Sequence, residues 1–416
     1  MTTSAIASAE ESEIFDPLNP SNIHNPFPFL ASLREHQPVY WNTKHAFWLL
    51  TRYQDVKAAL QNATQFSSAI GADMQRRADR FPEAAQKNFA VGHRFFYGSL
   101  IAAEPPQHRH QRQAVMKAFS PRVIGEMYAA VSKRVELLLD GLEREKTFDF
   151  VARFAYPLPS LVIFDLLGIP AEHHETIREG AAALVSFPPS VYQSNFARME
   201  HIAECLTRSE AVLQDLIRQR RAVPTEDLIS LLANEDDEGL RMPDDDIVVL
   251  CNFLLVAGHE TTANLLGGSM RHLLENRALW NQLRDAPELI ENAVEELLRF
   301  VSPVLWVSRV AAEDIEIGAQ VIRKGARIQL GIASGNHDPR EFQDPDSIDF
   351  TRPKPHSLAF GYGAHFCIGA ALARMEAQIA LSALLRRLPD VRLATDKFEY
   401  QPVYFLRALK ALPVAV

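Results

Sequence analysis

The stretch LAFGYGAHFCIGAALARME, from Leu358 to Glu376, holds three glycines, a histidine and a cysteine within nine positions. An apolar pattern with helical spacing follows, so the stretch predicts a glycine-rich loop that leads into a helix. It is not a dinucleotide-binding G-x-G-x-x-G, because Phe366 stands where the third glycine is required. It is not a zinc ribbon, because the chain has no second cysteine pair. Cys367 is therefore either a buried structural cysteine or a ligand of another kind.

The composition is typical of a globular protein. The 416 residues are 47% hydrophobic and carry a formal net charge of −9. No long basic run occurs, so nucleic acid is not an expected partner. The three cysteines, Cys205, Cys251 and Cys367, are too few and odd in number for a disulfide framework. We therefore expect a protein of the reducing cytoplasm.

The chain is expected to form one domain over residues 15–416. Residues 1–14 lack the basic and apolar regions of a signal peptide and predict a disordered tail. The strongest apolar run, residues 247–258, is too short to span a bilayer. No membrane anchor is therefore predicted.

Helical periodicity dominates from about residue 121 to 298, and short extended stretches return near 315–330 and 390–412. The predicted fold class is mainly α with a minor β part. The capping signal MPDDD predicts a long helix from about Asp245 to Glu275. This helix is apolar around much of its circumference, so it is expected to lie inside the protein.

The cysteine loop resembles the haem-binding loop of the cytochromes P450 at six fixed positions. The matching residues are Phe360, Gly361, Gly363, His365, Cys367 and Gly369. The resemblance implies the P450 fold, with haem b between the long buried helix and the cysteine loop and its helix. It implies that the Cys367 thiolate is the axial ligand, which favours O–O cleavage. It also implies that Gly361 and Gly369 let the backbone approach the ring, that Phe360 belongs to the same haem site, and that His365 meets a propionate.

A second motif, AGHETT at residues 257–262, lies in the long buried helix. It is not the zinc-protease pattern H-E-x-x-H, because Ala263 stands where the second histidine is required. It resembles the family's oxygen-activation segment, A-G-x-(D/E)-T-T. The resemblance implies that Glu260 and Thr261 form an acid–alcohol pair that delivers protons. Ala257 and Gly258 would then border the haem and admit O2.

A third resemblance is the pair E-x-x-R formed by Glu296 and Arg299, with Arg352 in FTRP completing a structural triad. On its own the pair is a weak signal, because ion pairs three residues apart are common on helix surfaces. The chain carries His337 where many relatives have arginine, and no loss of function is expected from this.

Two further motifs supply basic residues for the haem propionates. EPPQHRHQRQAVMKAFSP, residues 104–121, resembles the family's H-x-x-x-R helix and implies His108 and Arg112 as propionate partners. Arg309 in WVSRVA matches another such position. Arginine suits carboxylates because its guanidinium can bind them through two parallel hydrogen bonds.

The implied function is that of a haem-thiolate monooxygenase, which inserts oxygen from O2 into a hydrophobic small molecule by hydroxylation or epoxidation. Its electrons are expected from an external ferredoxin and ferredoxin reductase, and a monomer is expected. One alternative is a peroxide-driven peroxygenase, against which the Glu260–Thr261 pair argues. The other is a haem-binding sensor that performs no oxidation.

The resemblance also suggests which residues line the substrate pocket. The set is apolar and rich in aromatic side chains, as is typical of small-molecule pockets. It comprises Phe95, Phe96, Phe187, Asn252, Phe253, Val256, Val304, Trp306 and Phe405.

Overall fold

The computed structural model describes residues 14–234, 241–353, 356–403 and 405–416. Residues 1–13, most of the predicted tail, lie outside the described residues. Helices dominate, and they are α1 (Pro20–His24), α2 (Phe27–His36), α3 (Tyr53–Gln61), α4 (Gly71–Ala78), α5 (Glu83–Tyr97), α6 (Gln107–Met116), α7 (Pro121–Leu142), α8 (Pro157–Leu167), α9 (His174–Val185), α10 (Phe187–Tyr192), α11 (Phe196–Ala222), α12 (Leu228–Ala233), α13 (Asp244–Glu275), α14 (Arg277–Asp285), α15 (Ile290–Val301), α16 (Ile332–Asn336) and α17 (Ala370–Arg387). The predicted class, mainly α with a minor β part, is confirmed.

The strands form three small sheets. The first has the order β1 (Val39–Asn42), β2 (Phe47–Leu50), β8 (Arg327–Leu330), β5 (Val307–Ala311) and β3 (Phe66–Ser67). The second has the order β4 (Thr147–Asp149), β10 (Pro413–Ala415) and β9 (Arg392–Leu393), and the third pairs β6 (Ile315–Ile317) with β7 (Gln320–Ile322). In the first sheet only β2 and β8 run parallel, and Arg309 of β5 pairs with Ile328 of β8.

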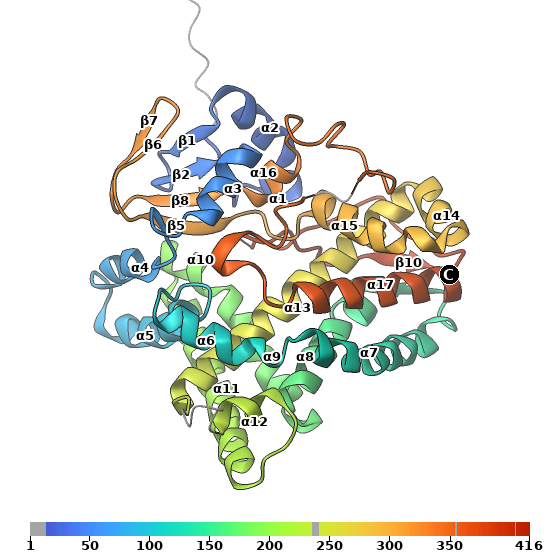
Figure 1. Cartoon of the computed structure of the whole chain (residues 1–416), viewed down its shortest axis with the longest axis horizontal. Helices are drawn as coiled ribbons and strands as arrows, with labels where there is room; N and C mark the ends of the chain where they lie inside the picture. Colours follow the sequence, from blue (N-terminus) through green and yellow to red (C-terminus); the bar gives the residue numbers. More distant parts are fainter. Residues whose placement is uncertain (1–13, 235–240, 354–355, 404) are drawn as a thin grey trace, which may run out of the picture.

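Helix α13 crosses the middle of the molecule with α17 beside it, and strands β1, β2, β5 and β8 of the first sheet lie at the upper left of the view (Figure 1). Three aspartates, Asp244 to Asp246, occupy its first turn, where negative charge is favourable. Within the described residues, α13 alone is long and apolar enough to cross a membrane, but 67% of its apolar window is buried in the protein. The prediction of a long internal helix is confirmed, one residue longer at its start.

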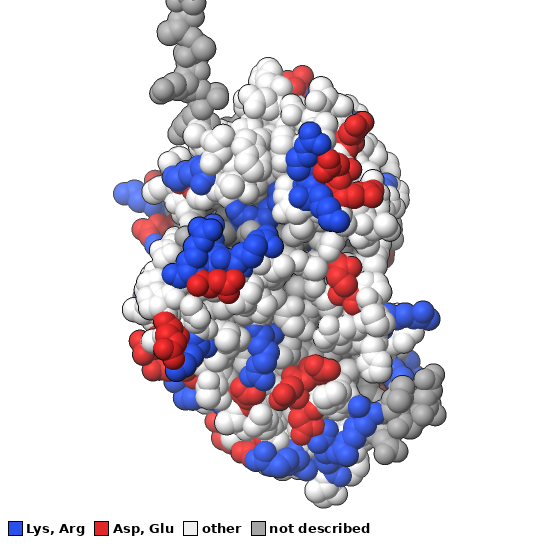
Figure 2. All heavy atoms as spheres, turned by 90° about the vertical axis from the view of Figure 1, so that its left-hand side faces the viewer, with Lys and Arg blue, Asp and Glu red and all other residues white. Residues whose placement is uncertain are grey.

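The surface is mixed in charge. Acidic and basic side chains are interspersed over the face shown in Figure 2. This agrees with the modest net charge of the chain.

Candidate active site

The cysteine loop ahead of α17 is closed by its own backbone. The amide of Cys367 donates to the carbonyl of Phe360 at 2.9 Å. Gly361 and Gly363 have φ angles of +66° and +72°, in the left-handed region where other residues are strained. A Cβ at position 363 would also lie 2.7 Å from the carbonyl oxygen of Leu60 in α3. Glycine is therefore required at position 363 for two independent reasons.

Cys367 lines a cavity between α13 and the start of α17. Burial raises the pKa of its thiol, whereas the backbone amide of Gly369 and the guanidinium of Arg112 lower it. The structure thus already directs a backbone N–H toward the sulfur, where a thiolate ligand would carry negative charge.

The cavity is lined from two sides, and both contribute apolar residues and glycine. From α13 it is lined by Phe253, Leu254, Ala257, Gly258, Thr261, Thr262 and Leu265. From the cysteine loop and α17 it is lined by Phe360, Gly361, His365, Phe366, Cys367, Ile368, Gly369, Leu372, Ala373 and Glu376. The cavity thus combines a sulfur donor, backbone without side chains at its glycines, and apolar walls. These features fit a flat apolar macrocycle that is held through its metal.

Basic side chains from separate segments meet at this cavity. Arg112 of α6, Arg309 of β5 and His365 line it, and the ring of His108 lies 4.1 Å from that of His365. Burial lowers the pKa of Arg309 to about 10, and burial with the neighbouring positive charges lowers that of His365 to about 3. Nε2 of His108 is buried with no hydrogen-bond partner among the described residues. The two guanidinium groups are positively charged, and the two neutral imidazoles can each donate an N–H group. This cluster favours an anionic ligand, and the two carboxylates of haem fit it.

Adjacent residues of α13 face different environments. The Thr261 side chain lines the cavity, and its hydroxyl donates to the carbonyl of Ala257 at 2.6 Å. Glu260 does not line the cavity; its Oε1 accepts a hydrogen bond from the Tyr156 hydroxyl at 3.2 Å. Burial raises the pKa of the Glu260 carboxyl, and the hydrogen bond from Tyr156 opposes that rise. The helix thus presents an alcohol to the cavity, while the carboxyl group of the preceding residue lies outside the cavity against Tyr156.

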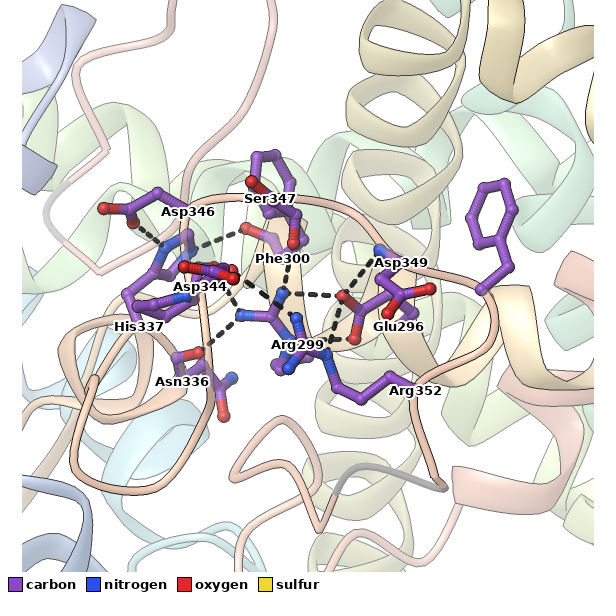
Figure 3. Close-up of polar contacts among 12 residues, drawn as sticks. Glu296, Arg299, Phe300, Asn336, His337, Asp344, Asp346, Ser347, Asp349 and Arg352 are labelled. Carbon is purple, nitrogen blue, oxygen red and sulfur yellow. Dashed lines mark hydrogen bonds and ion pairs between the residues drawn. The ribbon is translucent and has the colours of Figure 1, made fainter.

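Glu296, Arg299 and Arg352 come together in the structure (Figure 3). Arg299 donates from Nε and Nη2 to the two oxygens of Glu296 at 2.9 and 2.7 Å. Arg352 donates from Nε to Oε1 of Glu296 at 3.2 Å. The side chains of Glu296 and Arg299 are both 0% exposed. This ion pair is therefore buried. The E-x-x-R motif alone could not distinguish such a buried pair from the ion pairs that are common on helix surfaces.

Arg299 also anchors the segment that leads toward the cysteine loop. Arg299 donates to the backbone carbonyls of Asn336, Pro345 and Ser347 at 2.8, 2.7 and 3.0 Å. The two ring nitrogens of His337 lie 2.8 Å from a carboxylate oxygen of Asp346 and 3.0 Å from the carbonyl of Phe300 (Figure 3). His337 thus makes its own contacts within this network.

Two of the nine residues predicted for the substrate pocket, Phe253 and Val304, line the cavity. The other seven do not: Phe95, Phe96, Phe187, Asn252, Val256, Trp306 and Phe405. Phe95 and Phe187 are fully buried in the apolar cluster around α5 and α11, where they pack against other core side chains. The Asn252 amide accepts from the Ser209 hydroxyl at 2.8 Å and is used to join α13 to α11.

Sequence reasoning missed several residues that line the cavity. The apolar ones include Leu100, Ile101, Ile163, Val307 and Ile332. They come from four different parts of the chain, and nothing in their local sequence separates them from other core residues.

Glu376 of α17 was also missed as a residue of the cavity. It lines the cavity, is 2% exposed, and its Oε2 has no hydrogen-bond partner among the described residues. Burial raises its pKa to about 8. No local signal separates Glu376 from the other polar residues of α17, such as Arg374 and Gln378.

Replacing Glu376 by glutamine is expected to flatten the pH dependence of stability. The pKa of Glu376 is raised in the folded protein. Its contribution to the free energy of unfolding is therefore fully present below the pKa that it has in the unfolded chain, and it is lost as pH rises through about 8. Between pH 5 and 8.5 the wild type should lose on the order of 3 kcal/mol relative to Glu376→Gln. Urea unfolding of the haem-loaded protein at several pH values measures this. The exposed Glu288→Gln variant is the control, and equal pH dependence in all three proteins would contradict the prediction.

Comparison with known proteins agrees with this geometry. The family model "Cytochrome P450" matches residues 35–389. A polyketide biosynthesis cytochrome P450, PksS, of Bacillus subtilis is 34% identical and covers 98% of this chain and 99% of its own. Nocardicin C N-oxygenase of Nocardia uniformis is 37% identical over 93% of this chain and 94% of its own.

Solved structures show the same architecture. The structure of P450BioI in complex with an acyl carrier protein ligated to hexadec-9Z-enoic acid superposes with a TM-score of 0.86 at 32% identity, over 96% of this chain and 100% of that one. Proteins of this family hold haem b through a cysteine thiolate, and Cys367 is at the corresponding position of the loop. Fold, site and similarity agree, and the chain belongs to the cytochrome P450 family as a haem-thiolate monooxygenase.

Proposed function

We propose that this monooxygenase hydroxylates or epoxidises a hydrophobic small molecule with O2 and two electrons from a ferredoxin and its reductase. The observation that carries the proposal is the α13 wall of the cavity. Apart from Thr261 and Thr262 it is built from apolar residues and glycine, and it faces Cys367 across the space. Thiolate-ligated haem supplies the capacity to bind O2 and to favour its cleavage.

The residues of the chain would divide the remaining work. Cys367 would hold the haem iron, and Arg112, Arg309, His108 and His365 would pair with its carboxylates. The apolar wall would hold the substrate by removing its surface from water. Thr261 lines the cavity, so its hydroxyl would deliver there the protons that the neighbouring Glu260 supplies.

The comparisons support the reaction class more than a substrate. The names of the relatives refer to polyketide biosynthesis and to nocardicin C, and they do not agree on one substrate. What they share is oxidation of a small organic molecule. That the protein acts as a monomer in the cytoplasm stays a prediction.

The test starts with the absorption spectrum of the reduced protein under carbon monoxide, in which thiolate ligation gives a strongly red-shifted Soret band. Apolar compounds are then screened for a change of spin state, and those that bind are incubated with O2, a ferredoxin, its reductase and reduced nicotinamide cofactor. Oxygenated product supports the proposal. Product with hydrogen peroxide alone, and none with O2 and reductant, would favour the peroxygenase. Binding without product in either case would favour the sensor.

Thr261→Ala is expected to lower the product formed per O2 consumed by roughly 10- to 100-fold, because the cavity loses its proton-relaying hydroxyl. O2 consumption and product are measured together in the reconstituted system. Thr207→Ala is a matched control, because Thr207 of α11 makes the same bond to a carbonyl one turn earlier, at 2.8 Å to Ala203. Equal product yields from both variants would contradict the role of Thr261.

A further inference from the structure

The Glu260 carboxyl group of α13 forms a hydrogen bond with a tyrosine from another segment, and this tyrosine belongs to none of the motifs described above. Successive residues of a helix point about 100° apart, so a cavity-facing Thr261 places Glu260 on a neighbouring face. There the Tyr156 hydroxyl donates to Oε1 of Glu260 at 3.2 Å. In the part of the chain that the structure describes, this is the one side-chain hydrogen bond that Glu260 receives.

Tyr156 is held firmly enough to position its partner. It lies between a π-helical turn, Val151–Ala155, and the first residue of α8. Its ring packs edge-on against His259 with centroids 3.9 Å apart, and its carbonyl accepts a hydrogen bond from the Ser160 hydroxyl at 2.8 Å. The phenol group therefore reaches Glu260 from a fixed backbone and a packed ring.

The charges around this contact are few. Burial lowers the pKa of His259 to about 4, so its ring is neutral near neutral pH. From α9, Glu175 and Arg178 form an exposed ion pair and act electrostatically on Tyr156. Burial and the Glu260 carboxylate raise the pKa of Tyr156, which keeps its hydroxyl protonated as a donor. The hydrogen bond therefore stabilises the ionised carboxylate of Glu260 against the effect of burial.

We propose that Tyr156 is a positioning residue for proton delivery. Its hydroxyl holds the Glu260 carboxyl group outside the cavity, against the segment that precedes α8, and keeps this group able to ionise. The inference rests on the proposed function. Each proton that Glu260 accepts from solvent passes on toward Thr261, which restores the carboxylate. Tyr156 gives up no proton, because it only donates the hydrogen bond that stabilises the carboxylate between transfers.

The direct test is the titration of Glu260 by NMR in haem-loaded protein labelled with 13C at the glutamate carboxyl carbon. The Glu260 resonance is identified by its loss in Glu260→Gln. Tyr156→Phe removes only the hydroxyl, and the midpoint of Glu260 is expected to rise by about one pH unit, the size of one hydrogen bond to a charged group. A fluorinated tyrosine at position 156, a stronger donor of nearly the same shape, is expected to move it the opposite way.

Activity gives the second readout. The rate of product formation is measured against pH, and the part of this profile that depends on Glu260 is identified by its loss in Glu260→Gln. In Tyr156→Phe this part is expected to move to higher pH, and the product formed per O2 consumed is expected to fall several-fold. Tyr40→Phe is the control, since among the described residues the Tyr40 hydroxyl accepts only from the amide of Phe15, at 3.3 Å. In Tyr156→Phe/Glu260→Gln, losing the tyrosine hydroxyl should add nothing to the effect of Glu260→Gln.

The outcomes separate the inference from the function on which it rests. An unchanged Glu260 titration in Tyr156→Phe, with Glu260→Gln still impairing turnover, overturns the role of Tyr156 and leaves the proposed function standing. A wild type that makes no oxygenated product overturns the proposed function, and the titration then still decides whether Tyr156 sets the ionisation of Glu260.

Discussion

Cys367→Ser is expected to fold and yet to lose the red-shifted Soret band of the reduced carbon monoxide complex, together with all product formation. A serine hydroxyl at this position keeps the loop geometry, because the bond from the amide of residue 367 to the Phe360 carbonyl involves only backbone. It does not supply the soft, electron-rich thiolate that favours O–O cleavage. The spectrum and the product assay of the reconstituted system measure the two losses.

Cys205→Ser is the matched control for that experiment. Cys205 is a buried cysteine of α11 that contacts His201 and Arg208 and lies outside the cavity. Its spectrum and turnover should match those of the wild type. A thiolate-type spectrum that persists in Cys367→Ser would show that another group binds the iron.

Glu296→Ala is expected to destabilise the protein by about 3–5 kcal/mol, because it leaves the buried Arg299 guanidinium without its carboxylate. The loss reaches beyond the pair, since Glu296 also accepts from the amide of Asp349 at 3.1 Å and from Arg352 (Figure 3). Urea unfolding of the haem-loaded protein measures the change, and loss of the Soret band during unfolding reports release of haem.

The adjacent residue offers a control on the same helix. Glu295 pairs with Arg374 of α17, and their side chains are 13% and 33% exposed. Glu295→Ala should therefore cost less than Glu296→Ala, because the Arg374 guanidinium that it leaves is accessible to water. Equal destabilisation by Glu295→Ala and Glu296→Ala would contradict a special role for the buried pair. A matched loss in Arg352→Ala is not expected, because Arg352 reaches Glu296 from a partly exposed position.

The elements that the sequence predicted well are those with a strong local signal. The long helix from about Asp245 was evident from its three aspartates and continuous apolar character, and α13 begins one residue earlier. The glycine pattern around Cys367 was equally informative, because Gly361 and Gly363 adopt backbone angles that few other residues tolerate. For Glu296 and Arg299, spacing predicted that the two side chains could touch, but only the fold shows that they are buried.

The substrate pocket shows where sequence reasoning reached its limit. Phe253 faces the cavity while Phe95 and Phe187 are buried among other helices, although all three are apolar aromatic residues of similar local context. Which way a side chain faces depends on the neighbour against which its helix packs, and that neighbour is distant in sequence.

The sequence by itself determined the family, the cysteine ligand and the order of the motifs, because each depends on residue types at short, fixed spacings. The tertiary structure decided which side chains share the cavity, that Glu376 is buried against it without a partner, and that Tyr156 bonds to Glu260. The physical reason is that burial and hydrogen bonding join residues from separate segments: Tyr156 and Glu260 are 104 positions apart, and only the packing of α8 against α13 brings them together.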